Sequence, residues 1–446
     1  MISILSLSCE DFVTVDAPNY EITGELLFTD ASSVDAALTD IYSQLRDNIL
    51  TTGNILGVGY LMGLYTDELV NYNPNAAALL FYENTVLPNN NSVLNFWSGG
   101  YNLIYATNSI IEGVTASHAF SIEEKNTYLG EAYFLRGFIH FYLVNLFGDI
   151  PYIRTTDYEK NQSIPKLNQD VVYSEIILDL QESKSFLEEL PMGDSNFRIN
   201  QLVSSAFLSR VYLYQHLWEE ALNEADYVIN SGHYQLQSDI DQVFSNLSPE
   251  TIWQFDTGRA GANTLDAQTY VFVSGPPPNS ALSEAFISKM EPQDFRFTQW
   301  IGQVTNGSET WFFPNKYKFN SLTDTTQECS IIFRLAELYL IRAEAYAQLG
   351  QIPNALNDLN RIRDRAHLSP ITSIDSDTVL NAIYEERRFE LFTEMGHRFL
   401  DLKRTGLIHN TLENVKPNWK PTMDRLPIPD SELILNPSLN PQNDGY

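Results

Sequence analysis

Two stretches of the chain, residues 201–230 and 333–366, carry the same pattern of small and aromatic residues at a constant offset of 134 positions. In each stretch a small, an aromatic and a second small residue follow one another at gaps of three and nine. Small residues let two paired helices approach closely, and an aromatic ring fills the space between repeats, so we expect two helical hairpins of one repeat type. The matched pairs are Ser209 and Ala343, Tyr212 and Tyr346, Ala221 and Ala355, and Leu222 and Leu356.

The spacing is that of tetratricopeptide repeats (TPR), which are built from helix–turn–helix units. Only two clear copies are visible, and they are far apart in the chain. Residues 149–168 form an insertion that splits a further expected pair of helices. The sequence therefore predicts an all-α fold, a TPR-containing helical scaffold with loop-rich insertions, and not a continuous solenoid.

Helical periodicity of apolar residues predicts five further helices. One of them is apolar nearly all round, and we expect it at the centre of the helical array. The last is rich in charges of both signs at i,i+3 and i,i+4 spacing, which predicts ion pairs that fix it in place. These helices are expected at about 34–49 (capped by Ser32 and Ser33), 93–113, 123–147 (the apolar one), 170–189 and 376–405 (the charged one).

Residues 233–330 differ in character from the helical segments around them. They are rich in Gly and Pro and in aromatic residues, and a short strand is expected at 270–273. Loops that carry aromatic side chains on a rigid frame are typical of a recognition surface. We expect this insertion to hold much of the ligand-recognition region.

The charge balance of the 446-residue chain is strongly acidic. Against 27 Lys and Arg stand 57 Asp and Glu, which gives a net charge of −30. Such a chain repels the phosphates of nucleic acids and of anionic membranes, so no nucleic acid is expected as a partner. It suits a neutral or cationic ligand better than an anionic one.

Sequence motifs for metal or cofactor chemistry are missing. The seven His residues do not fall at metal-ligand spacing, and no EF-hand or nucleotide-binding loop is present, so neither metal nor cofactor is expected. Adjacent carboxylates such as Asp67 and Glu68 leave a glycosidase open as an alternative. That enzyme needs two carboxylates facing each other across a cleft, which sequence adjacency does not provide.

Aromatic residues carry the main functional prediction. The chain has 55 Phe, Tyr and Trp, and many of them fall in predicted loops. Aromatic planes stack on the apolar faces of sugar rings, while polar groups bind the hydroxyl rim. Trp97 lies inside a predicted helix and is expected in the core. The loop candidates for glycan contact are Tyr72, Tyr82, Tyr270, Trp300, Trp311 and Phe312.

The N-terminus begins with an apolar stub followed by Ser8 and Cys9. This pattern resembles the end of a bacterial lipoprotein signal, in which the Cys becomes the acylated first residue. Its eight residues before Cys9 include no basic residue, whereas a secretory signal usually has a basic start. A frayed terminus with a chance Cys is the alternative interpretation.

Several segments together resemble the SusD/RagB family of outer-membrane lipoproteins. The resemblance extends in order over essentially the whole chain. The segments are CEDF (9–12), RGFIHFYLVNLFGDIP (136–151), FRLAELYLIRAEA (333–345), LNRIRDR (359–365), EERRFEL (385–391), GHRFLDLKR (396–404) and the C-terminal stretch 426–446.

The resemblance implies a non-catalytic protein with a TPR-based helical fold. It implies a lipid on Cys9 as the sole membrane attachment, and a place on the extracellular face of the outer membrane. It also implies an oligosaccharide ligand and a SusC-like TonB-dependent transporter as partner. The family has no fixed ligand motif, so the aromatic candidates rest on the residues alone.

The resemblance and the composition together suggest four regions. These are a signal remnant with the lipidation Cys at 1–9, an N-terminal helical region with the first hairpin at 10–232, the loop-rich insertion at 233–330 and a C-terminal region with the second hairpin at 331–446. A TPR-type peptide-binding module is the main alternative function. It predicts a groove lined by Ser205 and Tyr212 of the first hairpin.

Overall fold

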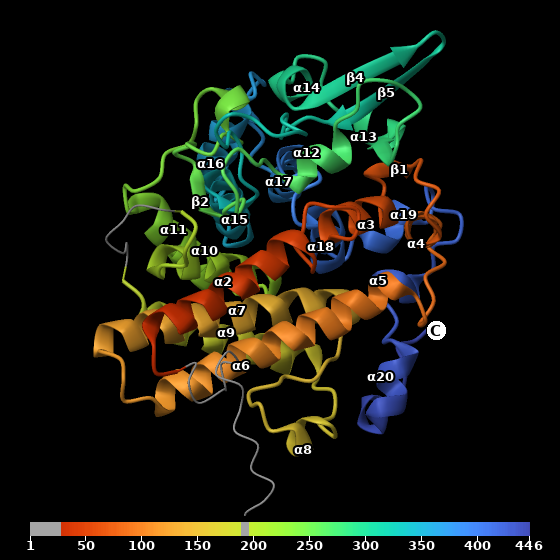
Figure 1. The fold of residues 1–446 in the computed structure, drawn as a ribbon. Helices are drawn as coiled ribbons and strands as arrows, with labels where there is room; N and C mark the ends of the chain where they lie inside the picture. The colour runs from red at the N-terminus through yellow and green to blue at the C-terminus, as the bar shows by residue number, and fades with distance from the viewer. Residues whose placement is uncertain (1–27, 189–195) are drawn as a thin grey trace, which may run out of the picture.

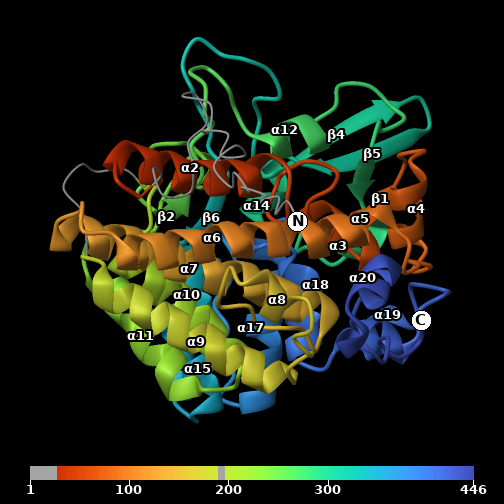
Figure 2. The same ribbon diagram turned by 60° about the horizontal axis from the view of Figure 1, so that its bottom comes forward.

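The computed structural model describes residues 28–188 and 196–446, so Cys9 lies outside the described residues. Its helices stack into one array, with the loop-rich insertion at one end (Figures 1 and 2). The array helices are α2 (Ala31–Asp47), α6 (Gly100–Ala116), α7 (Ile122–Phe147), α9 (Gln169–Phe186), α10 (Gln201–Tyr214), α11 (Trp218–Asn230), α15 (Leu335–Gln348), α16 (Ile352–Arg365) and α17 (Ser376–Glu390).

Helix α7 is the centre of the array, as its apolar sequence predicts. It packs between α6 and α9, and from Tyr128 to Phe147 every residue except Tyr133 is buried. Ser121 caps its first turn in a reciprocal pair with Glu124, which satisfies two free backbone N–H groups.

The two repeats are neighbours in space although 134 positions separate them in the sequence. Helix α11 of the first hairpin packs against α15 of the second, so the hairpins follow one another in the stack. The small residues Ala221 of α11 and Ala355 of α16 are fully buried, and each of these helices packs against the first helix of its own hairpin. The all-α, TPR-containing scaffold is thereby confirmed.

Three details of the expected helices are wrong. Helix α2 is capped by Asp30 and not by Ser32 or Ser33, because the Asp30 carboxylate accepts the backbone N–H of Ser33. The predicted strand at 270–273 does not form: Tyr270 is the last residue of helix α12 (Leu265–Tyr270), which Thr264 caps, and residues 271–273 are neither helix nor strand. The charged segment 376–405 forms two helices, α17 and α18 (His397–Arg404), separated by residues 391–396, the last of which is Gly396 with a φ of 76°.

The remaining elements are short. Three two-stranded antiparallel sheets pair β1 with β3, β2 with β6 and β4 with β5. Trp97 lies in a π-helical turn before α6 and is buried, as expected. The strands are β1 (Leu69–Asn71), β2 (Thr251–Gln254), β3 (Ser280–Leu282), β4 (Ile301–Asn306), β5 (Glu309–Pro314) and β6 (Ile331–Arg334). The short helices are α3 (Val58–Tyr65), α4 (Ala76–Tyr82), α5 (Asn91–Leu94), α8 (Tyr158–Asn161), α13 (Glu284–Ile287), α14 (Phe295–Gln299), α19 (Ile408–Leu412) and α20 (Asp430–Leu435).

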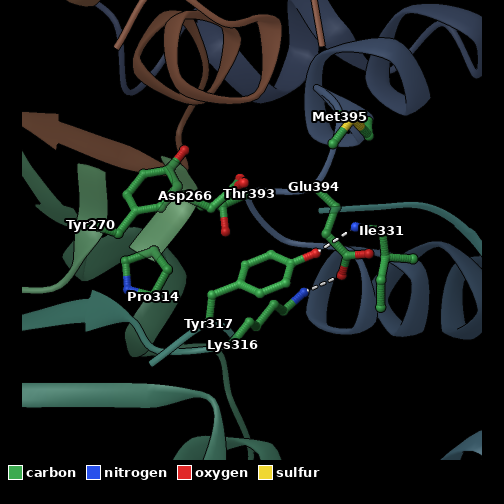
Figure 3. A pocket seen from close by; sticks show the side chains of 9 residues that line it. All are labelled: Asp266, Tyr270, Pro314, Lys316, Tyr317, Ile331, Thr393, Glu394 and Met395. Atoms are coloured by element: carbon green, nitrogen blue, oxygen red, sulfur yellow. Dashed lines mark hydrogen bonds and ion pairs between the residues drawn. The ribbon is translucent and has the colours of Figure 1, made fainter. Parts of the chain in front are cut away.

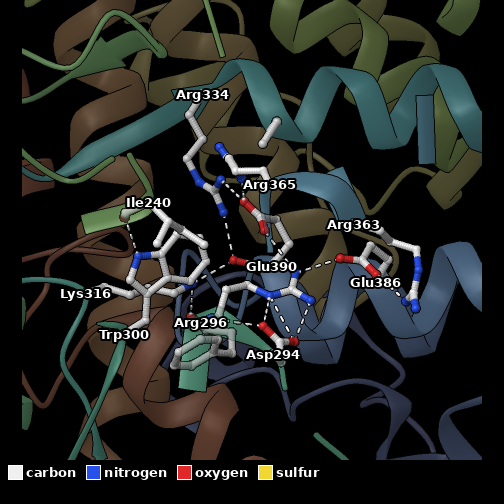
Figure 4. Close-up of polar contacts among 12 residues, drawn as sticks. Ile240, Asp294, Arg296, Trp300, Lys316, Arg334, Arg363, Arg365, Glu386 and Glu390 are labelled. Atoms are coloured by element: carbon white, nitrogen blue, oxygen red, sulfur yellow. Dashed lines mark hydrogen bonds and ion pairs between the residues drawn. The ribbon is translucent and has the colours of Figure 1, made fainter. Parts of the chain in front are cut away.

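A buried cluster of ion pairs joins the insertion to the helical array (Figure 4). Glu390 of α17 accepts hydrogen bonds from three guanidinium groups: Arg296 of α14 at 3.0 Å, Arg334 of β6 at 2.5 Å, and Arg365 of α16. All four side chains are 3% exposed or less. The arginines hold the pKa of Glu390 well below its usual range, although burial alone would raise it. The ion pairs expected for this charged segment are confirmed.

Candidate functional site

An open cavity of about 410 Å³ lies on the outer side of the insertion. Its walls come from β1, β3, α13 and β5, which are grouped at one edge of the molecule in Figure 1. Three of the six aromatic candidates, Tyr72, Trp311 and Phe312, meet here. The lining residues are Val70, Tyr72, Ala281, Leu282, Glu284, Ile287, Thr310, Trp311 and Phe312.

Backbone pairing places Tyr72 at this cavity. Strand β1 is antiparallel to β3, with Val70 opposite Ala281, and the N–H of Tyr72 donates to the carbonyl of Asn279 at 2.8 Å. The ring of Tyr72 is 39% exposed, which is high for an aromatic side chain held by ordered backbone.

Trp311 of β5 is fixed on two sides. Its Nε1–H donates to the Tyr72 hydroxyl at 3.1 Å, so the two rings are linked across 239 positions of sequence. The loop before β3 rests on its ring, because a Cβ at Gly275 would lie 2.0 Å from the Trp311 ring. Only glycine allows this approach. Trp311 itself is 7% exposed and lines the cavity.

Phe312 and Tyr82 are half-buried. The Phe312 ring packs against Phe297 at a centroid distance of 5.8 Å and lines the cavity. Tyr82, at the end of α4, does not line it. The Lys416 ammonium lies 4.2 Å from its ring centre and donates to its carbonyl at 3.0 Å. Burial raises the pKa of Tyr82, with a further contribution from Tyr72.

Trp300 is turned into the protein. It is 1% exposed, and its Nε1–H donates to the carbonyl of Ile240 at 2.8 Å, beside the ion-pair cluster (Figure 4). The Lys316 ammonium lies 5.0 Å from its ring. In this position it supports the insertion and has no face for a surface ligand.

Tyr270 is also interior and 4% exposed. It lines an enclosed cavity of about 10 Å³ with Asp266, Lys316 and Glu394 (Figure 3). That volume fits about one water molecule. Burial raises the pKa of Asp266 to about 6 and lowers that of Lys316 to about 8. These are buried polar groups of the core and not a ligand site.

Sequence reasoning missed Glu284 and Thr310, which add polar groups to the aromatic cavity. Glu284 is exposed at the first position of α13, directly after its cap Ser283. Nothing in the local sequence marks either residue, because both reach the cavity through the long-range pairing of strands.

The residues expected to line a TPR peptide groove are buried. Ser205 is fully buried and Tyr212 is 7% exposed. A cavity of about 660 Å³ does lie beside the second hairpin and includes Tyr339. The Tyr339 ring is contacted by the guanidinium groups of Arg342 and Arg361, 5.4 and 5.1 Å from its centre. An arginine-covered ring is a poor stacking surface.

Within residues 28–188 and 196–446 there is no group of three or more His, Cys, Asp or Glu arranged to hold a metal ion. The same residues include no helix with both the length and the apolar character needed to span a bilayer.

Comparison with known proteins identifies the family. The model described as "SusD family" matches residues 296–446, and the one described as "Starch-binding associating with outer membrane" matches residues 32–213. The chain belongs to the SusD/RagB family. Together the two matches cover most of the helical array.

Relatives of known name agree with this assignment. SusD-like protein P25 of Formosa agariphila is 25% identical over 98% of this chain and 97% of its own. SusD-like protein P2 of the same organism is 28% identical over 81% of this chain and 82% of its own.

Solved SusD structures share the fold. A SusD superfamily protein from Bacteroides vulgatus has a TM-score of 0.81 at 23% identity and covers 94% of this chain and 100% of its own. A protein described as a laminarin-binding SusD-like protein has a TM-score of 0.78 at 23% identity, covering 93% and 99%.

Proposed function

We propose that this SusD/RagB protein binds an oligosaccharide at the aromatic cavity formed by Tyr72, Trp311 and Phe312. The observation that carries the proposal is the meeting of these three rings, from distant parts of the chain, on one open surface. The descriptions of a matching family and of a structural neighbour support a glycan ligand. They are starch-binding for one family model and laminarin-binding for one structural neighbour.

The cavity suits a sugar ring physically. Exposed Tyr72 and half-buried Phe312 present apolar ring surface to the C–H faces of the sugar, and Trp311 holds Tyr72 in place through its indole N–H. Glu284 and the Thr310 hydroxyl can accept hydrogen bonds from its hydroxyl groups. Such a shallow contact gives modest affinity for one oligosaccharide. A long polysaccharide that contacts several protein molecules at once binds more tightly.

Delivery completes the proposed role. The protein is held on the extracellular face of the outer membrane by a lipid on Cys9 and passes the glycan to a SusC-like TonB-dependent transporter. The energy for import comes from the transporter. Co-purification of a tagged chain with a TonB-dependent transporter tests the pairing, and a chain recovered alone from mild detergent contradicts it.

Binding is tested by calorimetric titration against a panel of polysaccharides. Tyr72→Ala and Phe312→Ala are each expected to weaken binding of the best ligand about 5- to 30-fold, because each removes stacking surface worth about 1–2 kcal/mol. Tyr105→Ala is the matched control, since Tyr105 is 54% exposed on α6 and does not line the cavity. Equal losses in all three variants would contradict the site.

We propose further that the protein does not cleave its ligand. A glycosidase needs two facing carboxylates, and among the described residues that line the cavity Glu284 is the single carboxylate. Incubation with fluorescently labelled oligosaccharides is expected to release no product. Release that is lost in Glu284→Gln would establish an enzyme instead.

A further inference from the structure

We infer that the aromatic cavity accepts neutral glycans and rejects glycans that carry sulfate or carboxylate groups. The inference rests on the proposed function and names the class of ligand. Its basis is the placement of charge in the molecule, which the sum of −30 alone does not reveal.

Most of the positively charged side chains of this protein are buried or half-buried. All 27 Lys and Arg fall within the described residues, and only six of them are exposed. Many others pair with carboxylates inside the fold, as Arg210 does with Glu337 and Arg404 with Glu344. The outer surface is therefore dominated by carboxylates. The exposed cations are Arg154, Lys160, Arg259, Lys289, Arg361 and Lys420.

None of these six cations lines the aromatic cavity. Its one charged side chain among the described residues is Glu284, which is exposed at the rim. Arg388 approaches the rear of α13, where it donates to the carbonyl of Ala285 at 3.2 Å. It is 1% exposed, pairs with Asp67 at 2.9 Å and does not line the cavity.

The hydrogen-bond donors of the cavity are also limited. The indole N–H of Trp311 already donates to the Tyr72 hydroxyl. The other side-chain donors on the lining are the hydroxyl groups of Tyr72 and Thr310, and the Thr310 hydroxyl already shares a hydrogen bond of 2.9 Å with the hydroxyl of Thr305. Glu284 offers only acceptor oxygens. A sugar hydroxyl can donate to Glu284. A sulfate or carboxylate would lose hydration without gaining an N–H or a cation in return.

Discrimination between neutral and anionic glycans therefore has an attractive part and a repulsive part. A neutral sugar gains stacking and a hydrogen bond to a carboxylate, whereas an anionic sugar meets like charge at the rim. The penalty is electrostatic and lies at an open surface, so salt should weaken it.

The test compares each polymer with its own charged derivative. Soluble α-glucan, laminarin, mannan and xylan are titrated beside their sulfated forms of matched chain length, with alginate and polygalacturonate added as natural polyanions. In 20 mM salt the best neutral ligand is expected to bind at least tenfold more tightly than its sulfated form. In 500 mM salt the ratio should shrink.

Two charge variants locate the effect. Glu284→Lys is expected to reduce the neutral-to-sulfated ratio at least threefold in 20 mM salt. Glu182→Lys makes the same change in charge on the exposed face of α9, away from the cavity, and should leave the ratio within twofold of the wild type.

The outcomes separate the two claims. A sulfated polymer or a polyuronate that binds as well as or better than any neutral one overturns the inference and leaves the proposed function standing. Absence of binding to every polymer overturns both. Equal effects of Glu284→Lys and Glu182→Lys reject the cavity as the source of the discrimination.

Discussion

At the scale of single residues, Glu390 stabilises the fold by matching three buried positive charges. It contacts Arg296, Arg334 and Arg365, which come from three different elements. Glu390→Gln keeps the shape and removes the charge. We expect it to lower the free energy of unfolding by about 3–5 kcal/mol, because one partner of a buried ion pair is lost.

Glu385→Gln is the control for this change. Glu385 lies on the same helix, is 50% exposed and stands 3.6 Å from Arg388. An exposed pair of this kind contributes less than about 1 kcal/mol. Urea unfolding of both variants measures the difference, and similar losses would show that Glu390 is not the centre of the cluster.

At the scale of elements, Gly396 is the residue at which α18 begins, after the break that follows α17. Its φ of 76° is left-handed, and a Cβ there would lie 2.6 Å from Cγ1 of Val58 in α3. Gly396→Ala is therefore expected to cost about 2–3 kcal/mol through strain and a clash. Gly406→Ala has a similar φ of 70° with nothing within 4 Å, and should cost only about 1 kcal/mol. Equal losses in thermal unfolding would remove the steric part of this explanation.

Helices could be predicted from the sequence because their signal is local. The apolar segment predicted at 123–147 became α7, and the offset pattern identified the two hairpins. Gly396 was missed because the charged pattern continues across it. The segment at 270–273 was misread as a strand because its aromatic residues alternate, and Tyr270 and Phe272 are indeed buried, whereas the backbone there leaves helix α12 without pairing to another strand.

The aromatic site could be predicted only in part, for the same reason. Loop position correctly selected side chains that do not belong to the helical array, but it does not tell whether a ring faces inward. Trp300 and Tyr270 turn inward because both pack into the main hydrophobic core of the molecule, Trp300 beside the ion pairs. Tyr72 and Trp311 meet through strand pairing across 239 positions, which no local pattern encodes.

At the scale of the whole molecule, buried ionisable groups of two kinds set opposing pH responses. Burial raises the pKa of Glu68 and Glu328 to about 7. It lowers the pKa of His140 to about 3 and of His397 to about 4. Between pH 5 and 7 the carboxyl groups favour the folded state less as pH rises, while the histidines favour it more. The two trends offset each other in the wild type.

A substitution that removes one kind of group leaves the pH response of the other kind visible in the stability of the protein. In the wild type Glu328 stays protonated up to about pH 7 when folded but releases its proton near pH 4.5 when unfolded, so its stabilising contribution is full below pH 4.5 and is lost by pH 7. Glu328→Gln lacks this loss and keeps an acceptor for the N–H groups of Lys318 and Phe319. Its melting temperature relative to the wild type is expected to rise by about 3 °C from pH 5 to pH 8.

His397→Gln should show the opposite sign. Folded His397 is neutral above about pH 4, whereas the unfolded residue takes up a proton below about pH 6.5. The wild type therefore gains stability relative to the variant as pH rises from 4 to 6.5, and loses none of that gain above it. Melting curves in a single buffer series from pH 4 to pH 8 measure both variants. Parallel curves for the wild type and both variants would show that neither group changes its protonation on unfolding. Any pH dependence of the melting temperature would then have to come from the acidic surface.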